Sequence, residues 1–277
     1  MQTLHSGSLH EIAPGVRRLV APNPSLLSGA GTNTYIVGHE KFLVIDPGPA
    51  KAAHVDRILE LTGDRLETVL VTHTHTDHSP AATMLADRSG AALMGPLAIP
   101  GEEEDMSFKP SRVLDDNAIV TIEGRRIRAI HTPGHVRNHL CYLLEDSGLL
   151  FTGDHMNQGT TVVIIPPDGS MSDYLHSLQR LQREPVTRLA PGHGLVIEDA
   201  QAEVVRIHEH RMQRERKVVD QLKGRAPSTL EELLPRVYDD VNPALLSLAK
   251  RSLLAHLIKL KDERRALERQ HRWELVN

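Results

Sequence analysis

The sequence has little cysteine and few aromatic residues. A single cysteine, Cys141, stands among 277 residues, so the chain cannot form an internal disulfide. This fits a reducing compartment. Phe, Trp and Tyr make up only 3% of the residues, so Leu, Val, Ile and Ala must fill the interior. Cys141 belongs to the apolar run 140–144, which predicts a buried strand residue rather than a nucleophile.

Long apolar runs are also absent. No stretch approaches the roughly 20 apolar residues of a membrane span, and the N-terminus lacks the apolar core of a signal peptide. We therefore expect a cytoplasmic protein without a membrane partner. The net charge of −4 is small but uneven. Residues 1–200 hold 16 basic and 24 acidic residues (−8), while residues 201–277 hold 16 and 12 (+4). The basic end indicates a separate role.

Metal-binding side chains are concentrated in one short segment. The donors within residues 73–78 are His73, His75, Asp77 and His78. The apolar run Val69–Val71 before them predicts a buried strand, and Ser79 and Pro80 after them are typical of an N-cap and a first helical residue. The donors would then share a tight strand-to-helix loop. Imidazole and carboxylate donors without thiolate favour zinc over iron or manganese.

The segment His73-x-His75-x-Asp77-His78 resembles the signature of metallo-β-lactamase-fold hydrolases. The later pieces of that pattern follow in the family's order, each at the end of an apolar run. They are His135 in His131-Thr-Pro-Gly-His135, Asp154 in Phe151-Thr-Gly-Asp154 and His193 in Pro191-Gly-His193-Gly194. The resemblance covers approximately residues 15–200.

The resemblance implies a centre with two metal ions per chain, expected to be Zn²⁺, with iron or manganese as alternatives. The implied ligands of the first metal are His73, His75 and His135, and those of the second are Asp77, His78 and His193. Asp154 would bridge the two. A water shared by two such cations has its pKa lowered from about 15.7 towards 7 and becomes a hydroxide nucleophile. Asp77 and Asp154 are accordingly the predicted catalytic carboxylates.

The predicted fold class is α/β. Residues 1–200 would form the catalytic domain, for which the resemblance implies a four-layer αββα sandwich. Strands are expected at 34–37, 42–45, 69–71, 119–122, 126–130, 140–144 and 149–151, and helices at 50–61, 80–88 and 170–181. Asp46-Pro47-Gly48 indicates a turn, and residues 101–105, Gly-Glu-Glu-Glu-Asp, indicate an exposed acidic loop.

Residues 201–277 predict a small winged-helix-like domain. A charged helix over about 200–222 ends before Gly224, and a capping box of Ser228 and Glu231 opens a short helix. A further helix follows Asn242-Pro243, and the alternation over Leu267–Val276 is typical of a two-stranded wing. This order is similar to the C-terminal module of the lactamase-B-like branch of the superfamily.

The site predicts hydrolysis of an ester, thioester, lactone or related small molecule. The winged-helix appendage resembles a branch with endoribonucleases that act on single-stranded RNA, and basic residues near the last predicted helix would attract phosphates. These residues are Lys250, Arg251, Lys259 and Lys261. A zinc-dependent endoribonuclease with RNA as partner is therefore the alternative. A third hypothesis, an iron-dependent dioxygenase on the same fold, conflicts with the complete second ligand set.

Substrate contacts are less constrained by the sequence. Asn157 and Thr160 follow a predicted ligand and are candidates for bonding a substrate oxygen. His131 and His155 lie beside predicted ligands without matching a ligand position, and either is a candidate for supporting a neighbouring ligand. The sequence leaves open whether the protein forms a homo-oligomer.

Overall fold

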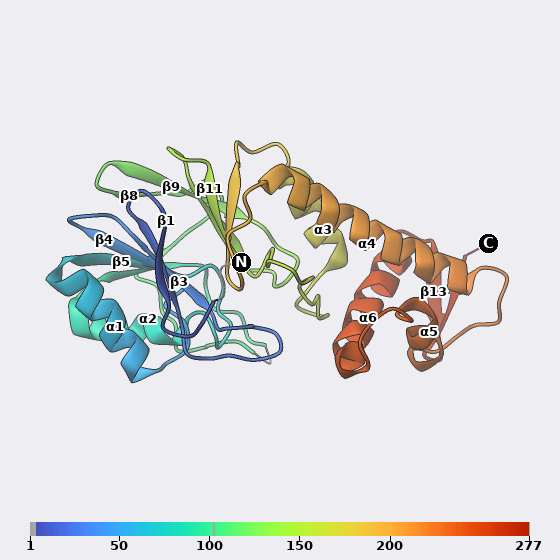
Figure 1. Ribbon diagram of the computed structural model, residues 1–277. Helices are drawn as coiled ribbons and strands as arrows, with labels where there is room; N and C mark the ends of the chain where they lie inside the picture. Colours follow the sequence, from blue (N-terminus) through green and yellow to red (C-terminus); the bar gives the residue numbers. More distant parts are fainter. Residues whose placement is uncertain (1–3, 102, 277) are drawn as a thin grey trace. The chain divides into compact units, whose positions relative to one another are not determined.

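The computed structural model describes residues 4–101 and 103–276, and the chain divides into two compact units. The first unit comprises Met1–Thr132, Asn138–Thr160 and Glu184–Gln201, and the second comprises Pro133–Arg137, Thr161–Arg183 and Ala202–Asn277. The second unit thus includes two segments that interrupt the first one in the sequence. The predicted α/β class is confirmed (Figure 1).

The larger sheet of the first unit has seven strands in sequence order. They are β1 (Leu9–Ala13), β2 (Val16–Val20), β3 (Asn33–Val37), β4 (Phe42–Ile45), β5 (Leu66–Leu70), β6 (Ala92–Gly95) and β7 (Arg112–Val113). Strands β1 to β4 pair antiparallel, and β4 to β7 pair parallel. Parallel neighbours need crossover connections. Helices α1 (Ala52–Thr62), followed by the short η1 (Gly63–Arg65), and α2 (Pro80–Ser89) supply two of them.

The smaller sheet has five strands in the order β12-β11-β10-β9-β8. They are β8 (Ile119–Ile122), β9 (Arg125–His131), β10 (Leu140–Leu144), β11 (Leu149–Gly153) and β12 (Arg188–Pro191). Strands β8 to β11 form an antiparallel meander, and β12 pairs parallel with β11. A tight turn joins β8 to β9. Its residues Glu123 and Gly124 have φ of 49° and 78°, which suits the twist of a tight hairpin.

Alternating side chains give the first unit two apolar layers. Tyr35, Val37 and Ile45 join Tyr142 and Phe151 in a core to which both sheets contribute. Residues of the opposite parity on β3 and β4 join side chains of α1 and α2 in a second core. Figure 1 shows the two helices along one side of β4 and β5. Successive side chains of a strand point to opposite faces of the sheet. The two faces of the larger sheet therefore contribute to different cores, which makes this sheet a middle layer.

Strand ends from both sheets are joined at one edge of the first unit. The Leu140 N–H donates to the Thr72 carbonyl at 2.8 Å, and the Gly192 N–H donates to the Gly153 carbonyl at 2.8 Å. The Asn33 N–H donates to the Gly192 carbonyl at 2.7 Å. These bonds bring the loops after β5, β11 and β12 together.

The second unit is mainly helical. Its elements are α3 (Met171–Leu181), nearly all of α4 (Ala200–Leu222), α5 (Leu230–Val237), η2 (Pro243–Leu245), α6 (Leu246–Asp262), β13 (Ala266–Arg269) and β14 (Arg272–Leu275). A core that includes Leu253, Leu257 and Trp273 binds α4, α5, α6 and the wing together. The antiparallel β13–β14 wing is confirmed. The predicted capping box was one residue early, since Thr229 and Glu232 form it.

No helix among residues 4–101 and 103–276 is both long and apolar enough to cross a membrane.

Candidate metal centre

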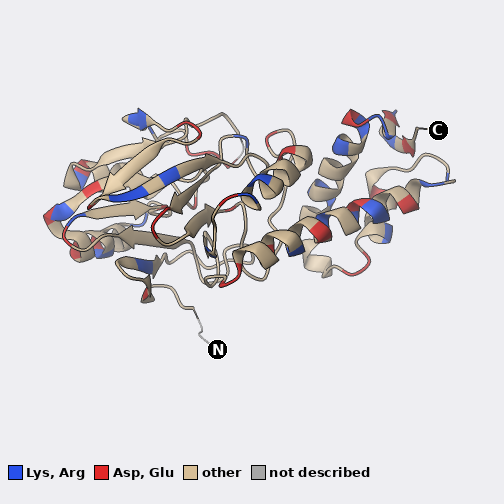
Figure 2. Cartoon of the chain, turned by 90° about the horizontal axis from the view of Figure 1, so that it is seen from above, with Lys and Arg blue, Asp and Glu red and all other residues tan. Residues whose placement is uncertain are grey.

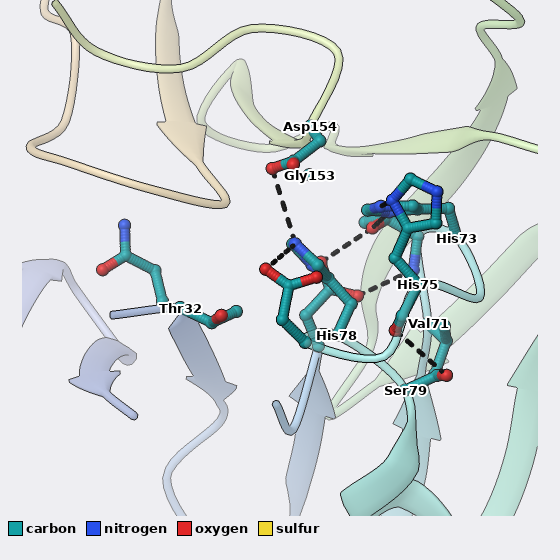
Figure 3. A network of polar contacts seen from close by, with 12 residues as sticks. Thr32, Val71, His73, His75, His78, Ser79, Gly153 and Asp154 are labelled. Carbon is teal, nitrogen blue, oxygen red and sulfur yellow. Dashed lines mark hydrogen bonds and ion pairs between the residues drawn. The ribbon is translucent and has the colours of Figure 1, made fainter. Parts of the chain in front are cut away.

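The loop between β5 and α2 carries the histidine-rich segment. His73 and His78 are fully buried, while His75 and Asp77 are partly exposed. The Nε2 atom of His73 and the Nδ1 atom of His75 lie 3.0 Å apart. Two ring nitrogens at this distance repel each other unless a proton or a cation lies between them. Figure 3 shows these two rings beside His78.

Two further loops bring donors to the same place. Asp154 follows β11 and His193 follows β12. The Asp154 Oδ1 atom lies 3.4 Å from His78 Nε2 and 3.2 Å from His193 Nε2. Asp77 Oδ2 lies 3.3 Å from His193 Nε2. Figure 3 shows Asp154 facing His78 from the opposite loop.

Glycine at position 192 allows this close approach. A Cβ atom at Gly192 would lie 2.8 Å from Asp154 Oδ1 and 2.8 Å from His78 Cε1. Any other residue would therefore displace two of the donors.

The donors fall into three overlapping groups, and within each group the ligand atoms lie within 4.8 Å of one another. The groups are His73, His75, His135; His73, His78, Asp154; and Asp77, His78, His193. Together they contain all seven side chains predicted as ligands. The Nδ1 atom of His135 is 2.9 Å from the Val163 carbonyl. A proton on Nδ1 leaves Nε2 as the ligand atom.

Histidines and carboxylates of this buried cluster shift one another's pKa values. Burial lowers the pKa of His78, but the carboxylates of Asp77, Asp154 and Asp46 outweigh it and raise that pKa well above the usual value. Burial likewise opposes charge on His193, and Asp154 raises its pKa to about 9. Burial raises the pKa of the Asp77 carboxyl, yet the nearby histidines bring it down to about 2.

The donor set fits divalent cations. The Nε2 atom of His78 is buried and makes no hydrogen bond, although two carboxylates lie within 3.7 Å of it. A buried polar atom without a hydrogen bond is costly, and a cation between these groups would remove that cost. Imidazole nitrogens with carboxylates are the ligands that zinc and iron accept.

Asp46, which the sequence predicted only as a turn residue, contacts the His78 ring on the side away from the other donors. Its Oδ2 atom accepts from His78 Nδ1 at 2.9 Å, and its Oδ1 atom accepts the Thr72 N–H at 2.7 Å. A carboxylate in this position fixes the tautomer and orientation of a ligand histidine. The only signal in the sequence is that Asp46 directly follows an apolar run, as the ligand loop does; the parallel pairing of β4 with β5 is seen only in the structure.

The predicted exposed acidic loop at 101–105 is wrong in part. The Glu104 side chain is 2% exposed and its Oε1 atom lies 3.7 Å from His75 Nε2. Asp105 is also buried, and it accepts the Ser79 hydroxyl at 2.8 Å. Ser79 precedes α2 as predicted but makes no side-chain cap bond. Glu102 lies outside the described residues.

The structure places the remaining candidates as follows. Asn157 is buried, and its amide donates to Asp154 Oδ1 at 3.0 Å and accepts the His193 N–H at 3.0 Å. Asn157 thus links two ligand loops. Thr160 is exposed. The substrate roles of both residues stay predictions.

Histidines outside the ligand pattern also differ in placement. His131 is exposed and His155 is fully buried. His139 was not predicted from the sequence as a site residue, but its buried ring stacks on that of His73 with centroids 5.1 Å apart.

Comparison with known proteins identifies the family. Residues 27–193 match the metallo-beta-lactamase superfamily, and residues 229–273 match the beta-lactamase associated winged helix domain. The chain belongs to the metallo-beta-lactamase superfamily. The predicted family, fold class and hydrolase activity are confirmed. Membership in this fold implies that the chain binds divalent metal.

Individual relatives of this metallo-beta-lactamase superfamily member span most of its length. A beta-lactamase-like protein 2 homolog from Caenorhabditis elegans is 29% identical over 85% of this chain and 80% of its own. An atrochrysone carboxyl ACP thioesterase from Aspergillus chevalieri is 30% identical over 97% of this chain and 89% of its own. The crystal structure of a beta-lactamase domain protein from Burkholderia ambifaria has a TM-score of 0.81 at 22% identity, covering 99% of this chain and 95% of that one. This last similarity shows the fold.

Proposed function

We propose that this superfamily member is a two-metal hydrolase that cleaves acyl thioesters of small molecules. The observation that carries the proposal is the position of Asp154. Its carboxylate forms a group with His73 and His78 in which the ligand atoms lie within 4.8 Å of one another, and its Oδ1 atom lies 3.2 Å from His193 Nε2. His73 belongs to the first proposed ligand set and His78 and His193 belong to the second, so one carboxylate adjoins both sets. Paired cations repel each other, and a shared carboxylate offsets that repulsion.

The chain supplies two ligand sets for the proposed metals. One cation would be held by His73, His75 and His135. The other would be held by Asp77, His78 and His193, and Asp154 would contact both. When bound, the cations lower the pKa of a coordinated water towards 7 and polarise the substrate carbonyl. The side chain of Asp77 is 36% exposed, so solvent reaches this proposed ligand.

The site favours an activated acyl group over an amide. As metal ligands, Asp77 and Asp154 would be carboxylates without a proton, so neither would donate a proton to a leaving group at pH 7. A thiolate leaves without such help because thiols have a pKa of about 8.5, whereas an amine requires protonation. A preference for thioesters agrees with the thioesterase named among the relatives.

A cysteine nucleophile does not offer a competing route. Cys141 is fully buried on β10, where its Sγ atom accepts the Thr132 hydroxyl at 3.2 Å and lies 3.7 Å from the Thr152 carbonyl. A buried thiol in apolar surroundings is inert.

The RNA alternative receives less support from the second unit. Lys250, Lys259 and Lys261, which the sequence offered as phosphate contacts, each pair with a glutamate of the same unit. Figure 2 shows basic and acidic residues interspersed along its helices. Interspersed charges of both signs produce a weak field for attracting a polyanion.

The proposal is tested with protein purified without chelator, whose zinc, iron and manganese are quantified. Thioesters are compared with oxoesters of the same acyl group, lactones and a single-stranded RNA oligomer. We expect two metal equivalents per chain and fastest turnover of thioesters, with activity lost to chelator and restored by metal. RNA cleavage without thioester turnover would establish the nuclease instead, and a single iron with oxygen consumption would establish the dioxygenase.

A further inference from the structure

Residues 103–105 run antiparallel to the histidine-rich loop. The Thr76 N–H donates to the Glu103 carbonyl at 3.0 Å, and the Asp105 N–H donates to the Thr74 carbonyl at 2.6 Å. His75 and Glu104 form the bridge between these bonds. This backbone pairing fixes the register of the two segments, so the Glu104 side chain lies beside the imidazole of His75.

The Glu104 carboxylate is held in a directed position. The Thr74 hydroxyl donates to Glu104 Oε2 because the Asn138 amide, which donates to Thr74 Oγ1 at 3.0 Å, occupies its acceptor side. The same amide donates to the Leu97 carbonyl at 2.9 Å. These contacts leave Oε1 facing His75 Nε2 at 3.7 Å. A carboxylate whose side chain is 2% exposed is costly to bury unless its charge has a use or a partner.

The two nitrogens of His75 face different groups. Its Nδ1 atom lies 3.0 Å from His73 Nε2, on the side of the predicted ligands, and its Nε2 atom faces Glu104. A carboxylate near Nε2 favours the tautomer that carries the proton there, which leaves the Nδ1 lone pair available to a cation. It also stabilises the positive charge that the ring acquires when it binds metal.

We propose that Glu104 is a positioning residue that selects the metal-binding tautomer of His75. Asp46 occupies the corresponding place behind His78, so each of the two histidines has a buried carboxylate on the side away from its ligand atom. The inference rests on the metal centre of the proposed function. It does not depend on the substrate.

The test compares Glu104→Gln with Glu103→Gln in the full-length protein. Glu103 is the matched control, since it neighbours Glu104, carries the same charge and is exposed. Both substitutions are made in the native protein and in a His75→Ala background. Zinc affinity is measured without substrate, by competition with a chromophoric chelator, together with the visible spectrum of the cobalt-loaded protein and the unfolding midpoint of the metal-free protein.

We expect Glu104→Gln to weaken zinc binding about 10- to 100-fold, the range typical of lost partners of ligand histidines, and to alter the cobalt spectrum. Glu103→Gln should change neither. In the His75→Ala background, Glu104→Gln should have no further effect on affinity, because the two residues act through one contact. Native affinity in Glu104→Gln, or an equal loss in both backgrounds, would overturn the inference. Failure of thioester hydrolysis with these affinity effects intact would reject the proposed substrate alone.

Discussion

Replacing Asp46 by Asn tests how the centre is supported. Asp46 is 2% exposed and accepts three hydrogen bonds: from the Thr72 N–H and the Thr72 hydroxyl, both at 2.7 Å, and from His78 Nδ1 at 2.9 Å. Asn preserves the shape of the side chain and tolerates the φ of 49° at this position. It offers one acceptor oxygen in place of two.

The expected loss in the free energy of unfolding follows from these hydrogen bonds. If the amide nitrogen replaces Oδ1, it opposes the Thr72 N–H, and if it replaces Oδ2, it opposes the proton on His78 Nδ1. In the second orientation the Thr72 hydroxyl, which also donates to Oδ2, must turn and accept from the amide. At least one bond to a charged acceptor is therefore lost in either orientation, which costs about 1.5–3 kcal/mol in the free energy of unfolding. The loss of control over the His78 ring should weaken metal binding about 10- to 100-fold.

The assay is urea unfolding of the metal-free protein followed by circular dichroism, with zinc affinity measured in parallel. Asp56→Asn is the control, because Asp56 makes an exposed ion pair with Arg88, worth about 0–1 kcal/mol. If Asp46→Asn matches Asp56→Asn in both stability and affinity, the support that we assign to Asp46 is refuted.

Three further predictions concern other parts of the chain. His75→Ala should abolish hydrolysis and leave the circular dichroism spectrum intact, whereas near-normal turnover would contradict its assignment as a ligand. Leu253→Ala, in the fully buried core around Trp273, should destabilise the second unit by about 2–5 kcal/mol, measured by the fluorescence of this single tryptophan. Burial lowers the pKa of His256 to about 4, so between pH 6.5 and 5 the unfolded chain binds the proton that the folded chain rejects. Stability should fall as the pH is lowered through this window, by about 1.5 kcal/mol, and His256→Gln should remove that share of the slope.

The sequence predicted seven ligand side chains, which the structure brings together, and most of the elements around them. His73 to His78 follow an apolar run and precede Pro80, which is local information, and the structure has β5 and α2 on either side of them. Likewise, the alternation near the C-terminus predicted the wing, because the pleat of a strand repeats every two residues. The capping box was predicted one residue too early because both Ser228 and Thr229 are good N-cap residues.

Only the tertiary structure identified the groups behind the ligands. Asp46 and His78 are 32 residues apart, and they meet because β4 and β5 pair in parallel with a particular register. Glu104 reaches His75 through two backbone hydrogen bonds of a loop, although its sequence is that of a solvated acidic segment. Composition and periodicity record what one segment prefers by itself. Which buried carboxylate faces which imidazole depends on how distant strand ends and loops are brought together, and no local pattern contains that information.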